Sequence, residues 1–194
     1  MAEESLLLHV CCYSCTLIAL EELKTFSKIE LFFYAPNIAG KNRFLKQEKD
    51  LNILAEERRL KLNIVPQDVR EFFSVVLPLE TPNSMQYDSD TIRRARKRCS
   101  FCYQLLLSVT ANFAKENNFS AFSTSLLSSP YQTRSEILLL GRIVEKATGV
   151  RFVDFDGRKK AFLGRKKAQS LGFYIPEACG CVYSQKDGEA PRLH

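Results

Sequence analysis

The stretch SLLLHVCCYSC, residues 5–15, decides the fold and carries the first chemistry in the chain. Its apolar half, residues 5–10, predicts a short buried strand. A helical pattern follows over about residues 15–26, so a group of cysteines lies where the strand ends and the helix begins. In open parallel α/β sheets, ligands bind outside the carboxyl ends of the strands. We therefore expect a pocket whose rim carries Cys11, Cys12 and Cys15.

The alternation of strand and helix patterns continues along the chain and predicts an α/β fold. The β-α-β-α-β order implies a parallel sheet with right-handed crossovers. A polar segment over residues 77–90 contains two prolines and is predicted to be a loop. Further strands are predicted at residues 29–34, 62–65, 119–124 and 151–154, and further helices at 42–59, 69–76, around Cys102 to about 115, and 134–148.

Length and composition bound the class of protein. The chain has 194 residues, 45% of them hydrophobic and 26% charged, which is typical of a folded globular protein. We predict one catalytic domain over residues 1–194, with a basic, cysteine-containing C-terminal extension over about 156–194. No apolar run approaches the ~20 residues that cross a membrane, and the acidic start predicts no signal peptide. We expect a cytoplasmic protein without a membrane partner.

Cysteine is the unusual residue. The chain has seven cysteines but only two histidines, and an odd count excludes a framework made only of intramolecular disulfides. Scattered buried cysteines would rarely all lie within three residues of another, so clustered thiols favour metal or redox chemistry. Three clusters hold them all: Cys11, Cys12 and Cys15; Cys99 and Cys102; Cys179 and Cys181.

The ligand type alone leaves three alternatives open. A [4Fe–4S] cluster takes four thiolates and would leave three cysteines for a second metal or a redox-active dithiol. Structural zinc also takes thiolates, although zinc ribbons use two Cys-x-x-Cys pairs and this chain has one. A disulfide between Cys179 and Cys181 would close a small, strained ring of the easily reduced kind.

Positive charge is concentrated beside the cysteines. The net charge is +6, and one basic run leads directly into Cys99. A run of this kind is often only a solvated face, but beside a candidate metal site and tyrosines it predicts RNA binding. The candidate RNA-binding residues are Arg93, Arg94, Arg96, Lys97 and Arg98 in the first segment, and Lys159, Lys160, Arg165 and Lys166, with Arg158 and Lys167 beside them, in a C-terminal loop region.

The loop after the first predicted strand lacks the signatures of nucleotide binding. It reads CCYSCT and has neither a glycine-rich phosphate loop nor the Ser-Gly-Gly-x-Asp-Ser loop of ATP pyrophosphatases. ATP-driven chemistry is therefore disfavoured. His9 lies in an apolar strand and is expected to be a buried core residue, so proton transfer falls to Asp, Glu, Tyr or Cys.

Several segments together resemble the QueH-type epoxyqueuosine reductases. These segments are LLHVCC at 7–12, YAPNI at 34–38, RCxxC at 98–102, STSL at 123–126 with SPY at 129–131, and CGCxYS at 179–184. They occur in the family order and span about residues 5–184. The resemblance implies a three-layer core like that of the ATP-pyrophosphatase-like (HUP-type) fold, without the nucleotide loop.

The resemblance also implies an activity and a site. It implies cobalamin-independent reduction of epoxyqueuosine to queuosine at the wobble base of tRNA, with an external electron donor. Carried over by position, a [4Fe–4S] cluster would be held by Cys11, Cys12, Cys99 and Cys102. A redox pair or a second, mononuclear iron would involve Cys179 and Cys181, with Cys15 as a further candidate.

The proton donor and two rival functions complete the expectations. Asp68 or Tyr13 is expected to protonate the departing epoxide oxygen. One rival is a cluster-containing tRNA-thiolating enzyme, which would need an ATP loop. The other is a zinc-containing module that binds tRNA without catalysis.

Overall fold

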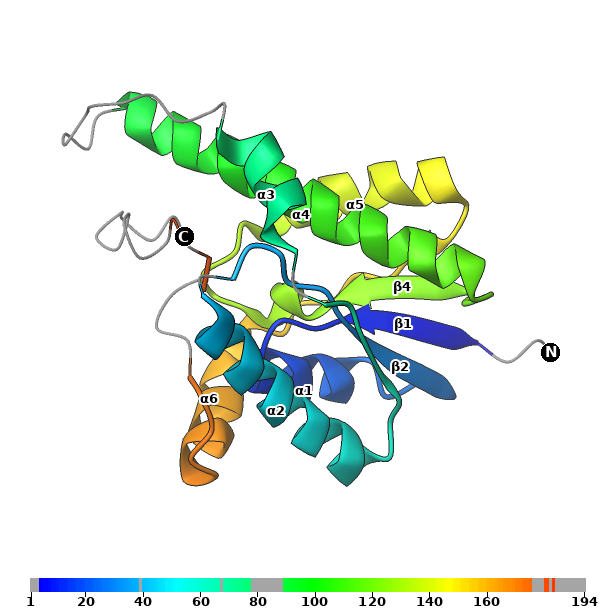
Figure 1. Cartoon of the computed structure of the whole chain (residues 1–194). Helices are drawn as coiled ribbons and strands as arrows, with labels where there is room; N and C mark the ends of the chain where they lie inside the picture. Colours follow the sequence, from blue (N-terminus) through cyan, green and yellow to red (C-terminus); the bar gives the residue numbers. More distant parts are fainter. Residues whose placement is uncertain are drawn as a thin grey trace.

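The computed structural model describes residues 4–38, 40–66, 68–77, 89–175, 180, 181 and 183, without the side chains of 75 and 89–96. Five parallel strands form one sheet in the order β3-β2-β1-β4-β5 (Figure 1). The strands are β1 (Ser5–His9), β2 (Lys28–Phe33), β3 (Leu62–Ile64), β4 (Ala121–Thr124) and β5 (Arg151–Phe152).

Helices cover both faces of the sheet. On one side of the sheet in Figure 1 lie α3 (Val69–Val76), α4 (Ser89–Glu116) and α5 (Arg134–Thr148). On the other lie α1 (Tyr13–Glu22), α2 (Lys41–Arg58) and α6 (Ala161–Ser170). The predicted three-layer parallel α/β fold is confirmed.

The central strand forms the core by alternating its side chains. Leu7 packs into one core cluster with residues of α4 and α5, whereas Leu6 and Leu8 pack into the other with residues of α1 and α2. Each of these leucines is fully buried. A strand covered on both faces carries a continuous apolar run. This explains why residues 5–10 lack the alternation of a half-exposed strand.

Three predicted features differ from the structure. The fifth strand is only Arg151–Phe152, shorter than predicted. Helix α4 begins at Ser89, inside the segment predicted to be a loop, whereas residues 78–88 of that segment lie outside the described part. The predicted C-terminal loop region instead contains the 3₁₀ helix η3 (Arg158–Lys160) and helix α6, so its basic residues lie on helices.

Helix α6 packs closely against α1. A Cβ atom on Gly164 would overlap the carbonyl oxygen of Ser14 and touch Ile18, so glycine is needed for this approach. The buried residues of α6 are Gly164 and Ala168, both small. The helix therefore lies against the turn that carries the first cysteine cluster. Among the described residues, no helix combines the length and apolar character of a membrane span.

Candidate metal centre and pocket

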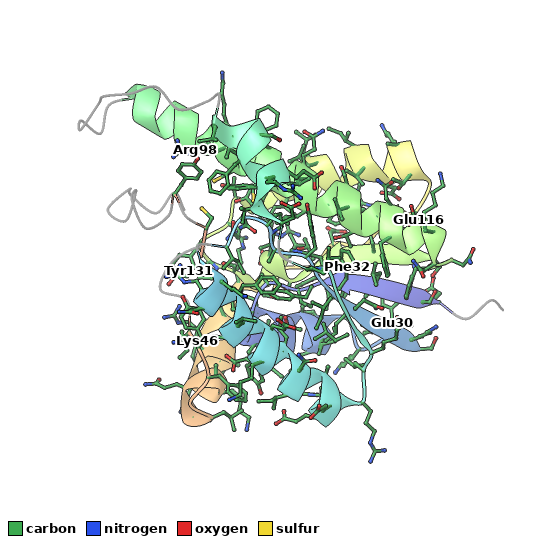
Figure 2. All side chains as sticks on the ribbon, in the orientation of Figure 1. Glu30, Phe32, Lys46, Arg98, Glu116 and Tyr131 are labelled. Carbon is green, nitrogen blue, oxygen red and sulfur yellow. The ribbon has the colours of Figure 1, made fainter. Side chains whose placement is uncertain are left out.

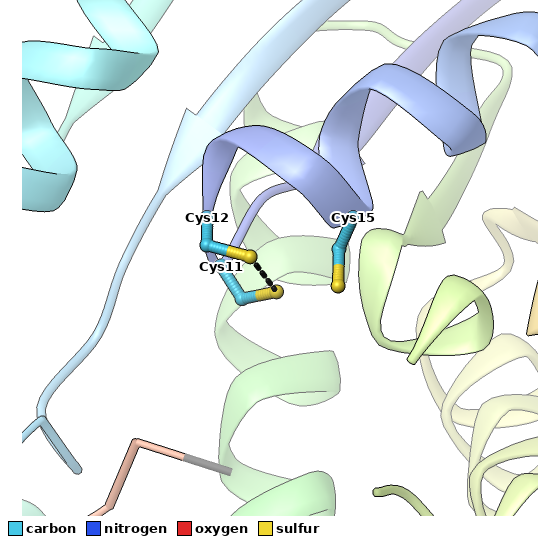
Figure 3. Close-up of side chains that lie close together, drawn as sticks. All are labelled: Cys11, Cys12 and Cys15. Carbon is cyan, nitrogen blue, oxygen red and sulfur yellow. Dashed lines mark hydrogen bonds between the residues drawn. The ribbon is translucent and has the colours of Figure 1, made fainter. Parts of the chain in front are cut away.

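The first three cysteines converge at the carboxyl end of the central strand. Cys12 is the N-cap residue of α1, and Cys15 lies in its first turn. N-cap and N3 side chains face each other at the start of a helix, as in a capping box. The three sulfur atoms lie within 4.8 Å of one another, and Cys11 Sγ is 3.9 Å from Cys12 Sγ (Figure 3). The structure thus places Cys15 with the pair that precedes it.

Ser125, which follows the neighbouring strand β4, holds the turn that carries the cysteines. The backbone N–H of Cys11 donates to Ser125 Oγ at 3.0 Å, and that hydroxyl donates to Cys11 Sγ at 3.3 Å. Ser125 opens the short 3₁₀ helix η2 (Ser125–Ser128), which follows β4 directly. The STSL segment therefore orients the first thiol.

Shared protons set the acidity of the three thiols. The Cys11 thiol donates to the Cys12 sulfur, which lowers the pKa of Cys12 well below the ordinary thiol value. The same hydrogen bond raises the pKa of Cys11, and hydrogen bonds to both neighbours raise that of Cys15. A metal binds thiols in their deprotonated form, so metal binding would release the protons that Cys11 and Cys15 retain.

His9, the last residue of β1, connects the ends of the two neighbouring strands. Its Nε2 lies 3.1 Å from the Tyr34 carbonyl oxygen, and its Nδ1 lies 2.9 Å from Thr124 Oγ1. A carbonyl can only accept, so Nε2 carries the hydrogen and Nδ1 accepts from the threonine hydroxyl. Burial lowers the pKa of His9 to about 4. As expected, His9 is a buried, neutral core residue with both ring nitrogens bonded.

A second group of thiols lies on α4 and the C-terminal segment. Cys102 is buried, and burial, followed by the charges of Cys181 and Cys99, raises its pKa well above the ordinary value. Cys181 pairs with Ile38 through an isolated antiparallel bridge. Cys11, Cys99 and Cys181 all pack against the core cluster that contains Cys102. Segments far apart in sequence therefore bring thiols to one edge of the sheet.

The assignment of four cysteines as ligands of a [4Fe–4S] cluster stays a prediction. The six described cysteines, all except Cys179, are free thiols. Cys179 lies outside the described residues, so the Cys179–Cys181 pair is untested. Cys102 of α4 lines the same pocket as the thiols of the β1 turn, and thiolate is the donor that iron–sulfur clusters require. The donor set therefore fits the implied cluster.

One pocket joins these thiols to polar and aromatic residues. Cys11, Cys12, Cys15 and Cys102 line it. Tyr34, Tyr103 and Tyr131 contribute aromatic surface, and Arg165 of α6 donates to Tyr131 Oη at 3.0 Å. Arg165 thus belongs to the pocket itself, although the sequence suggested only phosphate contact.

The Tyr34 hydroxyl faces an acidic partner. It donates to Glu71 Oε2 at 2.7 Å, and burial together with this hydrogen bond raises the pKa of Tyr34. Asp68, the N-cap of α3, also raises that pKa through its charge. Asp68 itself is half-exposed and paired with Arg70, whose guanidinium lowers the pKa of Asp68 to about 2. Asp68 therefore lies near the pocket tyrosine rather than on the pocket wall.

Tyr13 occupies a different environment. It is 1% exposed, belongs to the core beneath α1, and its ring centroid lies 4.7 Å from that of Phe173. Burial raises the pKa of Tyr13. The residues that line the described pocket do not include it.

The predicted RNA-binding residues separate into three groups. The side chains of Arg93, Arg94 and Arg96 on α4 are outside the described part. Lys97, Lys159 and Lys166 are exposed. Three others contact neighbouring side chains. Arg98, labelled in Figure 2, stacks over the Tyr183 ring at 4.7 Å, and Lys160 pairs with Glu22 at 2.7 Å. Arg165 donates to Tyr131, which Figure 2 also labels.

Sequence reasoning missed two polar residues of the pocket and a separate basic hollow. Gln47 and Ser128 line it and carry buried oxygen atoms without a hydrogen-bond partner among the described residues. A hollow at the start of α2 also gathers Lys41, Arg43 and Lys46. The signal for Gln47 was its place in the stripe Phe44, Gln47, Leu51 and Leu54, where a polar residue interrupts an apolar face.

These features define a class. The chain is a parallel α/β protein whose thiol-lined pocket lies at the carboxyl edge of its sheet. It belongs to the family described as epoxyqueuosine reductase QueH, whose profile matches residues 6–187. The resemblance noted in the sequence is confirmed, and with it the expectation of an oxidoreductase.

Relatives in several bacteria are similar over most of their length. The epoxyqueuosine reductase QueH of Thermotoga maritima is 28% identical over 185 residues, which cover 93% of this chain and 90% of that protein. The QueH of Acinetobacter baylyi is 29% identical over 195 residues, with 98% and 84% covered.

A solved structure shares the fold. The U34-tRNA thiolase NcsA from Methanococcus maripaludis, with its [4Fe–4S] cluster, superposes with a TM-score of 0.52 at 13% identity. The likeness covers 95% of this chain and 62% of that one. At this identity it supports the α/β fold and not a shared reaction.

Proposed function

We propose that this chain reduces the epoxide of epoxyqueuosine at the wobble position of tRNA, the last step of queuosine biosynthesis. The observation that carries the proposal is the three-thiol cluster in a pocket of a chain that belongs to the QueH family. The reaction breaks both carbon–oxygen bonds of the epoxide, consumes two electrons and two protons, and releases water. A low-potential external donor supplies the electrons.

A [4Fe–4S] cluster would be held by Cys11, Cys12, Cys99 and Cys102, with Cys15 in reach of the same turn. Cys179 and Cys181 would form a redox pair or hold a second, mononuclear iron. When bound, such groups supply single electrons and a Lewis acid for the epoxide oxygen. The chain's own residues then have to position the base, exclude water and deliver protons.

The placement of acidic residues favours one proton route. Asp68 and Glu71 lie on the α3 side of Tyr34, and the Tyr34 hydroxyl donates to Glu71 at 2.7 Å. The raised pKa keeps Tyr34 protonated at neutral pH. We assign Glu71 to relaying protons through Tyr34 Oη, whereas Asp68, ionised beside Arg70, acts on Tyr34 through its charge. Tyr13 is the weaker candidate because it packs against Phe173.

Basic side chains near the pocket would hold the tRNA backbone in the cytoplasm, where tRNA is modified. Lys159 and Lys166 are exposed on η3 and α6. Replacing both with alanine should weaken tRNA binding and flatten its salt dependence, since each phosphate contact releases a counterion. The matched control is Lys24→Ala, because Lys24 is exposed after α1, toward the amino edge of the sheet. If Lys24→Ala weakens tRNA binding as much as the double replacement does, Lys159 and Lys166 are not part of an RNA-binding surface.

The direct test uses protein reconstituted anaerobically with iron and sulfide. Epoxyqueuosine-containing tRNA is added with a low-potential donor, and nucleosides are identified by mass spectrometry. Conversion to queuosine is expected, and the metal-free protein serves as control. Persistence of the epoxide in the presence of a fully formed cluster would refute the proposal.

Two alternatives are separated by the same preparation. The fold neighbour is a tRNA thiolase, so sulfur incorporation into tRNA with added ATP would favour thiolation. A mononuclear thiolate site with metal–sulfur distances of about 2.3 Å has sulfurs ~3.8 Å apart. The 3.9 Å between Cys11 and Cys12 sulfurs suits such a site as well. Zinc without iron in anaerobically purified protein would favour the non-catalytic module.

A further inference from the structure

We infer that Gln47 recognises a hydroxyl group on the epoxide-bearing ring of the substrate, so that it determines specificity for epoxyqueuosine over an unmodified base. The inference rests on the proposed function and deepens it. Gln47 is 3% exposed, lines the thiol pocket, and its Oε1 atom has no hydrogen-bond partner within the described chain.

The location of Gln47 places it between the two thiol segments. On α2 it lies one turn before Asp50, whose pKa is raised by burial and also by the charge of Cys12, so this face of the helix is directed at the cysteine turn. On its other side, a Cβ atom on Gly180 would lie 3.9 Å from Gln47 Nε2. The amide therefore lies between Cys12 and the segment that carries Cys181.

A buried, unpartnered carbonyl oxygen is costly. Burying a polar group without a hydrogen bond destabilises a protein, because the group loses its hydrogen bonds to water. Other buried residues in the same stripe of α2, Phe44, Leu51 and Leu54, are apolar, so an apolar side chain would be expected at position 47 as well. A ligand that enters the pocket with a hydrogen-bond donor would satisfy the Gln47 carbonyl oxygen. Because Oε1 only accepts, the ligand group has to be an O–H or N–H donor.

The substrate offers such donors at the required place. In epoxyqueuosine, the ring that carries the epoxide also carries hydroxyl groups. If the epoxide lies among the thiols, these hydroxyls lie beside Gln47. Ser128, a second pocket residue with an unpartnered buried oxygen, comes from η2 and offers a further contact to the same polar ring. An unmodified guanine lacks the ring and cannot make these bonds.

The test measures binding to the reconstituted protein without an electron donor, so that no turnover occurs. Two tRNAs of the same sequence are compared, one with epoxyqueuosine and one with guanine at the wobble position. The variant Gln47→Met keeps the side-chain volume but removes the acceptor. The control Asn52→Leu changes an exposed residue of the same helix, whose amide contacts only the Glu48 carbonyl among the described hydrogen bonds.

The expected result is selective. Gln47→Met should bind epoxyqueuosine tRNA about tenfold more weakly, the loss expected for one hydrogen bond, and guanine tRNA as wild type does. Asn52→Leu should bind both tRNAs normally. Equal weakening for both tRNAs, or unchanged binding of epoxyqueuosine tRNA, would overturn the inference. Failure of the proposed function would be seen separately, as absence of epoxide reduction by wild type, and the inference would fall with it.

Discussion

Acidification should destabilise the protein through His9. The imidazole is fully enclosed, neutral and hydrogen-bonded at both nitrogens, with a folded-state pKa of about 4 against an ordinary 6.5. A histidine whose pKa is lowered by folding makes its full contribution to the free energy of unfolding at a pH above its pKa in the unfolded chain. That contribution is lost as the pH falls from 6.5 towards 4, because the unfolded chain binds the proton first.

The magnitude follows from the two pKa values. Relative to high pH, the loss at pH 5 is about 2 kcal/mol, and it approaches about 3.4 kcal/mol well below pH 4, using 1.36 kcal/mol per unit. At pH 7 the loss is only about 0.2 kcal/mol. Carboxylates such as Asp68 and Asp156, with pKa values of about 2, lose their contributions at lower pH. The pKa of Cys12 is also lowered, but Cys12 is present in both proteins compared below, so the difference between wild type and a His9 variant from pH 7 to 5 isolates the histidine.

The assay compares wild type with His9→Gln by urea unfolding at pH 7 and pH 5, at matched iron content. The wild-type free energy of unfolding should fall by about 2 kcal/mol more than that of the variant over this interval. Histidine NMR on metal-free protein should show a ring with a pKa near 4 and its hydrogen on Nε2. Parallel pH profiles for both proteins, or a hydrogen on Nδ1, would refute the reasoning.

Three further outcomes are expected. Gly164→Ala should cost about 1–3 kcal/mol in urea unfolding and reduce bound iron, because the added methyl displaces Ser14 in the cysteine turn; full stability would contradict the packing. Cys15→Ser should lower iron and sulfide per chain, and an unchanged cluster spectrum would assign Cys15 another role. Tyr34→Phe should reduce turnover about 100-fold with iron content unchanged, and Glu71→Gln should reduce it less; unaltered turnover in Tyr34→Phe would end the proposed proton route.

The central strands β1 and β2 were predictable because most of their residues are buried on both faces of the sheet. Residues 5–10 and 29–34 are apolar runs bounded by polar turns, and the structure places β1 and β2 there. The convergence of the cysteines at one sheet edge was predictable for the same reason, since parallel strands end together. The sequence also grouped Cys15 with Cys11 and Cys12, but its pattern located the start of α1 two residues late, so it did not predict that Cys12 caps the helix.

Helix α6 was missed because packing, rather than apolar periodicity, stabilises it. Its buried positions are Gly164 and Ala168, and its phenylalanine and leucine are exposed, so the segment resembled a basic tail. Gln47 was missed because a single polar residue in a charged helix resembles a surface residue. Both cases depend on contacts between elements distant in sequence, which local pattern does not encode.

The pairing of β1 with β4 has a consequence for how the protein acquires its metal. Ser125 meets Cys11 across 114 residues of chain, and β1 takes its place between β2 and β4. Contacts over such separations form slowly because a long loop has to close first. The three thiols of the first cluster are neighbours in sequence before that closure, whereas the serine that orients them arrives later. We therefore expect the three thiols to be most open to both oxidants and metals before β4 pairs with β1.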